Sequence, residues 1–229
     1  QLMAADPQKL KARLAALKGQ RQLHEHVWRD CCDYSKPELG SGFNLSQTAN
    51  ASEIQSRKNL LLDGTASDAL DTLADGFMYG LTPSHSLWLG LDIGQETHDE
   101  RQWLDEAAQM VWEYIHASNF DAEAHDAYKL IGAAGWFVLY EDWEEDDGRL
   151  YFENWPISQC HIASSRAGGR VDTIYREFEL TAGQCVHEFG ADRVSTQVRD
   201  MVANGRQDDM VSLLWAIEPR TDYTPGSRI

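Results

Sequence analysis

The chain has 229 residues, and its 20 Lys and Arg against 37 Asp and Glu give a formal net charge of −17. Hydrophobic residues make up 42% and charged residues 25%, a globular composition that excludes wholesale disorder. Because nucleic-acid affinity comes largely from Lys and Arg, this charge argues against a surface that grips phosphates, but it does not exclude DNA that passes without being held.

The sequence lacks the marks of membrane insertion and of secretion. No run of about 18 apolar residues is present, so we expect no membrane-spanning segment, and the polar start of the chain contains no signal-peptide core. Four cysteines, two of them adjacent, make no disulfide framework, which fits a reducing cytosol. The missing initiator Met and the turn-rich end at 224–227 suggest a piece of a longer protein.

In chain order, the first predicted element is a long helix over about 7–33. Asp6 and Pro7 have the chemistry of an N-cap and of a first helical residue, and an apolar stripe follows them. The segment 36–50 is rich in Pro, Gly, Ser and Asn and predicts a loop.

A second helix is predicted over 65–79, with Thr65 or Asp63 as its cap and Gly80 as its stop. Its apolar stripe follows helical spacing and consists of Ala66, Ala69, Leu70, Leu73 and Phe77. Pro83 prevents continuation of this helix. The alternation that follows predicts a strand, formed by Leu87, Leu89, Leu91 and Ile93 with Trp88 on its opposite face.

Two more helices and a hairpin are predicted in the middle of the chain. Asp99 is the predicted cap of a helix that ends near Ser118, and the next helix covers about 121–131, closed by Gly132 and Gly135. Strands over 136–143 and 149–155 then flank the turn signal Asp146-Asp147-Gly148.

The last third predicts strands, two short helices and a final strand. Strands are expected over 157–163 and 170–180. In the second of these strands, the side chains that should be buried are Val171, Ile174, Tyr175 and Phe178. Thr181 and Gln184 match a capping box, a further helix ends at Gly205, and Pro219 stops a strand over 210–217. Without regular βαβ alternation, this order predicts an α+β fold: several helices packed on a mostly antiparallel sheet.

No pattern in the sequence indicates catalysis, a cofactor or a metal. Phosphate-binding glycine loops and a nucleophile elbow are absent, and Gly132-Ala133-Ala134-Gly135 lies between helix and strand, the reverse of the nucleotide-binding order. The close pairs Cys160-His161 and Cys185-x-His187 are poorly spaced for zinc. We therefore expect a protein that is not an enzyme, although a Cys–His pair brought together by the fold stays open.

The most conspicuous local feature is an acidic run around Trp143. It consists of Glu141, Asp142, Glu144, Glu145, Asp146 and Asp147. Its spacing does not fit a calcium-binding EF-hand loop, because Gly148 comes one position late. We interpret it as a solvated hairpin tip, with weak divalent binding left open. The abundant aromatic residues are flanked by acids, which favours core packing or a subunit interface over a platform for single-stranded nucleic acid.

Six segments occur in a fixed order along the chain. They are 21–34 with its following Ser35-Lys36-Pro37, 62–76 with Leu81-Thr82-Pro83 and Trp88, 117–120, 132–141, 169–184 and 216–220. In this order they resemble the head-to-tail connecting (portal) proteins of short-tailed, podovirus-like phages. The positions that carry the resemblance are Thr65, Ala69, Leu70, Leu81, Thr82, Pro83, Trp88, Asn119, Phe120, Gly132, Gly135, Arg176, Gln184, Pro219 and Arg220.

The resemblance implies the N-terminal, mainly wing-like part of a longer structural subunit. It implies an N-terminal helix and loop over 1–50, an α+β wing-like domain over 51–220, and over 221–229 the start of a connection to a stem and clip. Such subunits form a ring, usually of twelve copies, through which DNA enters and leaves the capsid at one vertex. The resemblance brings no catalytic residue and no cofactor.

The partners that the resemblance implies are copies of the chain itself, scaffolding protein, capsid protein, terminase and a tail adaptor, in a virion assembled in the host bacterial cytoplasm. Double-stranded DNA would pass without tight binding, and the net charge fits this because an acidic wall repels phosphates within about 8 Å at physiological salt. The acidic run would lie in the channel or on another surface. The alternatives are another phage neck or tail adaptor, or a metal-dependent hydrolase that uses scattered Asp, Glu and His.

Overall fold

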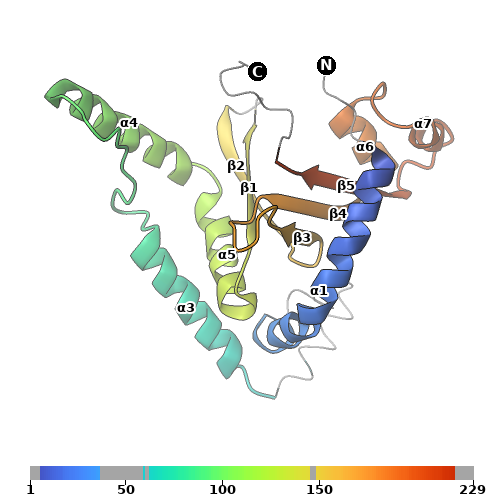
Figure 1. Ribbon diagram of the computed structural model, residues 1–229, viewed down its shortest axis with the longest axis horizontal. Helices are drawn as coiled ribbons and strands as arrows, with labels where there is room; N and C mark the ends of the chain where they lie inside the picture. Colours follow the sequence, from blue (N-terminus) through green and yellow to red (C-terminus); the bar gives the residue numbers. More distant parts are fainter. Residues whose placement is uncertain (1–5, 37–58, 60–61, 145–147, 220–229) are drawn as a thin grey trace. The chain divides into compact units, whose positions relative to one another are not determined.

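A computed structural model describes residues 6–36, 59, 62–144 and 148–219 of the chain (Figure 1). These residues divide into two compact units. We call residues 6–26 and 157–219 the sheet unit, and residues 27–36, 59, 62–144 and 148–156 the hairpin unit. The secondary structure confirms the α+β class, with two small antiparallel sheets where the sequence predicted one.

The first helix, α1 (Pro7–Ser35), confirms the predicted long helix and continues two residues beyond its expected end. Asp6 caps it, since its Oδ1 accepts a hydrogen bond from the Gln8 backbone N–H at 3.0 Å. α1 contributes to both units, through buried Leu14 and Leu17 in the sheet unit and buried Cys32 in the hairpin unit. The predicted loop that follows α1 lies, after Lys36, outside the described residues.

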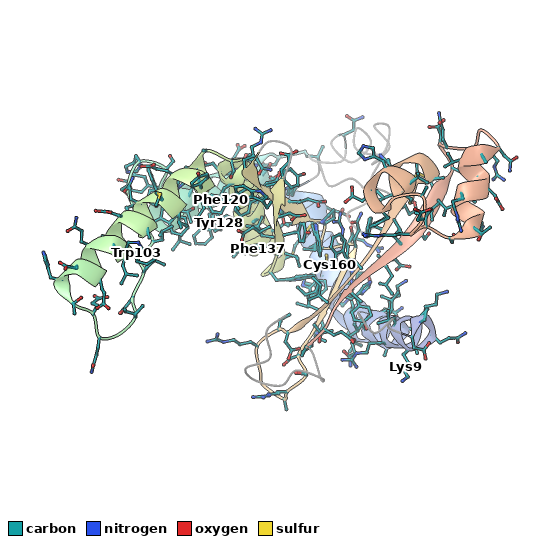
Figure 2. All side chains as sticks on the ribbon, turned by 90° about the horizontal axis from the view of Figure 1, so that it is seen from above. Lys9, Trp103, Phe120, Tyr128, Phe137 and Cys160 are labelled. Atoms are coloured by element: carbon teal, nitrogen blue, oxygen red, sulfur yellow. The ribbon has the colours of Figure 1, made fainter. Side chains whose placement is uncertain are left out.

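The hairpin unit combines three helices with a two-stranded antiparallel sheet. Its elements are α3 (Thr65–Leu81), α4 (His98–His116), α5 (Phe120–Ala134), β1 (Val138–Glu144) and β2 (Arg149–Trp155). The strands pair from Val138↔Trp155 to Glu144↔Arg149, which confirms the predicted hairpin. Its core consists of Ala74, Phe120, Ala124, Tyr128 and Phe152. Figure 2 labels two of these side chains, Phe120 and Tyr128, on the ribbon of this unit.

The predicted strand from Leu87 to Ile93 is wrong. These residues join no sheet among the described strands, and Leu87 and Ile93 are exposed. Trp88, on the opposite side of the alternation, is half-buried and packs against the core. The segment is therefore a connection between α3 and α4: the alternating side chains Leu87, Leu91 and Ile93 are left exposed, and Trp88 on the other side holds the segment to the core.

Three helix details differ from the prediction. In α3, Ala69 and Leu73 are exposed, because the buried face turns toward Leu70 and Ala74. Gly80 does not stop this helix, which runs to Leu81. Asp99 is not the cap of α4: Thr97 accepts a hydrogen bond from the Glu100 backbone, and the Glu100 carboxylate accepts one from the Thr97 backbone.

The two glycines at the end of α5 have different roles. Gly135 is the C-cap, with φ +83°, a left-handed conformation that favours glycine. Gly132 lies inside the helix, where a Cβ atom would be 2.5 Å from Leu70 Cδ1 and 3.1 Å from Leu73 Cδ2. The missing side chain therefore allows α3 and α5 to approach each other closely, and the prediction that Gly132 ends the helix is wrong.

The sheet unit contains three strands in the order β3-β4-β5, all antiparallel, and two short helices. Its remaining elements are β3 (Cys160–Ala163), β4 (Thr173–Thr181), α6 (Ala182–Phe189), α7 (Thr196–Ala203) and β5 (Met210–Ile217). The Thr181 and Gln184 capping box is confirmed. Tyr175 and Phe178 are buried as expected, whereas Val171 is exposed because β4 begins only at Thr173.

Identical substitutions at two helical glycines of the hairpin unit test the close approach of α3 and α5. Gly132→Val should lower the free energy of unfolding by about 1–3 kcal/mol, because the added methyl groups overlap Leu70. Gly76→Val is the matched control, since no atom lies within 4 Å of a Cβ there, and it should be nearly neutral. Urea unfolding measures both, and equal stability of the two variants would contradict the close approach.

Candidate functional site

The candidate site is the set of positions that carry the family resemblance, and in the hairpin unit these gather around α5. Asn119 comes directly before this helix, but its side chain does not cap it. Instead, Asn119 Nδ2 donates to the Phe152 carbonyl at 2.7 Å, and the Phe152 backbone N–H donates to Asn119 Oδ1 at 2.8 Å. An amide side chain supplies both a donor and an acceptor, so Asn119 binds the middle of β2 in the way a neighbouring strand would.

A second group of contacts holds the connection between α3 and α4. Trp88 Nε1 donates to His116 Nε2 at 3.0 Å, and His116 Nδ1 lies 2.8 Å from Asp121 Oδ1. Since Nε2 accepts a hydrogen bond from the indole, the ring proton of a neutral His116 is at Nδ1 and points to the Asp121 carboxylate. The Trp88 ring also stacks on Phe120, with 6.1 Å between ring centroids and 18° between planes.

The turn Leu81-Thr82-Pro83 ends α3 and is fastened to α5. The Thr82 backbone N–H donates to the Met78 carbonyl at 3.3 Å, and the Thr82 hydroxyl lies 3.1 Å from the Tyr128 hydroxyl. Thr82 is buried, while Leu81 is exposed. At the other end of α3, the Asp63 carboxylate accepts hydrogen bonds from both the backbone and the hydroxyl of Thr65, and these hydrogen bonds lower the pKa of Asp63.

In the sheet unit, the resemblance includes Arg176 and Arg21, which belong to a buried layer of hydrogen-bonded polar groups. Arg176 is buried, donates from Nε to Gln159 Oε1 at 3.1 Å and lies over the Phe178 ring. Buried Arg21 of α1 donates from Nη1 to the carbonyls of Ser158 and Cys160, at 2.7 and 2.8 Å. These bonds connect α1 and β4 to the segment that enters β3.

The remaining positions of this set lie at element ends. Gln184 completes the capping box of α6, and exposed Pro219 follows β5. Next to it, the Tyr175 hydroxyl donates to the Glu218 carboxylate, and burial together with this carboxylate raises the pKa of Tyr175 to about 12. Arg220 lies outside the described residues.

His161 on β3 is a buried titratable group in the same layer. It is nearly inaccessible to solvent, and its Nδ1 has no hydrogen-bond partner among the described residues. Burial and the nearby Arg21 and Lys18 lower the pKa of His161 to about 4, although Glu177 acts in the opposite direction. His161 is therefore neutral at pH 7.

The acidic run lies on the β1–β2 hairpin. Glu141, Asp142 and Glu144 are exposed on β1, and Glu144 Oε2 accepts a hydrogen bond from Arg149 Nε at 3.2 Å across the hairpin. Gly148 closes the turn with φ +62°. The other three acids, at 145–147, lie outside the described residues.

The close cysteine and histidine pairs do not form a ligand set. Cys185 is buried and His187 is exposed, and burial raises the pKa of the Cys185 thiol. Within the described part of the chain, no group of three or more His, Cys, Asp and Glu side chains is placed to hold a metal ion. Among these same residues, no helix has the length and apolar character needed to cross a membrane.

Comparison with known proteins decides the family. The family model of the bacteriophage head to tail connecting protein matches residues 7–228. The chain belongs to this family. It is 32% identical over 225 residues to the probable portal protein of Bordetella phage BPP-1 and 29% identical over 225 residues to the portal protein of Salmonella phage epsilon15. Each alignment covers 96% of this chain and 39% of the relative, so the chain spans about two fifths of the curated relatives' length.

Sequence reasoning found the family positions of this head-to-tail connecting chain but missed several of their partners. It overlooked His116 and Asp121 beside Trp88, because nothing in the sequence spacing joins these residues to that indole. It also overlooked the Thr97 capping box, although a Thr three residues before Glu100 was a usable signal.

The low pKa of His161 predicts a specific loss of stability in acid. An unfolded chain has the ordinary His pKa of 6.5, so the folded state binds fewer protons between pH 6.5 and about 4. The stabilising contribution is complete above pH 6.5 and is lost as the pH falls toward 4, by up to about 3 kcal/mol.

Thermal unfolding of the wild type and of His161→Gln at pH 7 and pH 4.5 measures this contribution. The variant should lose less stability on acidification than the wild type, because all other titrating groups are common to both proteins. The same loss in the two proteins would show that His161 is not the buried neutral group described above.

Proposed function

We propose that the chain is the N-terminal, wing-like part of a portal subunit, and that the complete protein forms a ring that serves as the DNA conduit at the capsid vertex and joins head to tail. One observation carries this proposal: two alignments, each over 96% of the chain, match it to the probable portal protein of one phage and to the portal protein of another. The adaptor and hydrolase alternatives are not favoured, because both of these relatives are portal proteins.

The contacts of the family positions support a mechanical role. Asn119, Gly132 and Arg176 act in hydrogen bonding and helix packing inside the two units, where they hold segments in place and are not presented to a substrate. A subunit that must keep its shape while DNA moves past it needs such internal joints. We propose that the chain is structural and has no enzymatic activity of its own.

The acidic character supports a conduit that does not hold DNA. With a net charge of −17, and with Glu141, Asp142 and Glu144 exposed, a wall of this composition repels phosphates at close range. The partners that we propose are neighbouring copies in a ring of about twelve, capsid and scaffolding proteins, terminase and a tail adaptor. Assembly would take place in the bacterial host before the ring becomes part of the virion.

Electron microscopy of the full-length protein tests the proposal. The expected result is a closed ring with a central channel wide enough for duplex DNA, roughly 20 Å or more, with the described fold in its outer, wing-like region. The same map should show whether 141–144 faces the channel. A monodisperse monomer, or a helical tube without a portal-like channel, would contradict the proposal.

A further inference from the structure

Helix α4 has two neighbouring apolar faces, and only one of them is covered. Leu104 and Ala108 are buried within the hairpin unit. The adjoining face leaves large side chains open to solvent: Trp103 is 67% exposed, Met110 57% and Tyr114 53%. With exposed Val111, these side chains are spaced i, i+7, i+8 and i+11, so they form one continuous surface, which we call the α4 stripe. Figure 2 shows Trp103 standing on this helix.

The residue types of the α4 stripe are those of an interface core. Trp, Tyr and Met are enriched at the centres of protein interfaces, and charged residues are depleted there. The stripe contains no charged side chain over nearly three helical turns, although the helix as a whole carries many acids. Single exposed apolar residues need no explanation, but four that share one helix face mark a contact surface.

Two acids border the α4 stripe and indicate the charge of what covers it. Glu106 and Glu113 each follow a stripe residue by three positions, and each accepts a hydrogen bond from a glutamine side chain, that of Gln102 or Gln109. Neither carboxylate has an ion-pair partner within the described helices and strands. The covering surface should therefore be apolar at its centre and cationic at one margin.

The chain itself offers a cationic surface. Its sequence from Pro7 to His24 contains basic residues and no acid, which is unusual in a chain of net charge −17. Arg21 is buried against carbonyls and Lys18 pairs with Glu177, but Lys9, Lys11 and Arg13 are exposed along α1. The Lys9 side chain extends from this helix in Figure 2. A second copy can thus bring cations to an acidic neighbour, which lowers the repulsion between two strongly negative chains.

We propose that the α4 stripe is the surface by which one subunit contacts a second copy of this chain in the ring. This inference rests on the proposed function. In a ring built by rotation, each subunit uses two different surfaces, one for each neighbour. The stripe is one of them, and the exposed cationic face of α1 is the charge-complementary candidate on the other copy.

A pair of lysine substitutions in the full-length protein tests the proposal. Met110→Lys places a charge in the α4 stripe and should raise the protein concentration needed for ring formation by roughly tenfold or more. Thr72→Lys is the control, because this exposed residue of α3 lies outside the stripe and its acidic border, and its rings should form as in the wild type. Mass photometry gives the ring fraction, and circular dichroism checks that both variants are folded.

Oxidative footprinting of Trp103 tests the same surface in the wild-type protein, so it does not depend on whether Met110→Lys folds. In wild-type fractions separated by size, Trp103 should be protected in rings and reactive in unassembled full-length subunits. Protection already present in the unassembled subunit would overturn the proposal, because the rest of the same chain then covers the stripe. Equal reactivity in both fractions, or normal assembly of folded Met110→Lys, would also overturn it. A wild type that forms no ring at all would instead contradict the proposed function.

Discussion

The paired hydrogen bonds between the Asn119 side chain and the Phe152 backbone are the contact on which the hairpin unit depends. They fix the start of α5 to the middle of β2, at 2.7 and 2.8 Å, in a part-buried position at a residue that is itself buried, Phe152. Phe120, the next residue along the chain, then lies against the Phe152 ring, with 5.1 Å between centroids. The Asn119 side chain thereby fixes both the position of the start of α5 along β2 and the position of the aromatic core.

The other contacts of the unit extend from this junction. The Trp88 ring stacks on Phe120 and its indole bonds to His116, so the connection between α3 and α4 is held by the same aromatic cluster. At the far end of α5, Gly132 lets α3 pack closely. These are demands of shape and of hydrogen bonding, and they explain why the positions that carry the family resemblance need no reactive chemistry. In the proposed portal subunit, rigid joints of this kind would keep the shape of the wing-like part while DNA passes.

Local sequence signals predicted the elements whose ends have their own chemistry. The Thr181–Gln184 capping box, the turn glycine Gly148 and the helix-ending Gly135 each determine the backbone within a few residues, and the structure has them where they were expected. Prediction from local sequence failed where a residue distant in the sequence determines the local structure. The pattern around Trp88 indicates a strand until His116 and Phe120 are placed beside it. The sequence around Gly132 predicts a helix end, because nothing near this glycine in the sequence indicates that Leu70 packs against it. Likewise, the buried layer around Arg21 joins residues more than 130 positions apart, which no local pattern encodes.

The central claim is that the family positions act by holding the fold, and Asn119→Ala tests it most directly. This substitution leaves the Phe152 N–H and carbonyl without partners, so the free energy of unfolding should fall by about 2 kcal/mol or more. Gln109→Ala, which removes an exposed side chain from the same unit, should change it by less than about 0.5 kcal/mol. Chemical denaturation of the two variants gives both values. If Asn119→Ala is as stable as Gln109→Ala, the junction does not support the unit and the account is wrong.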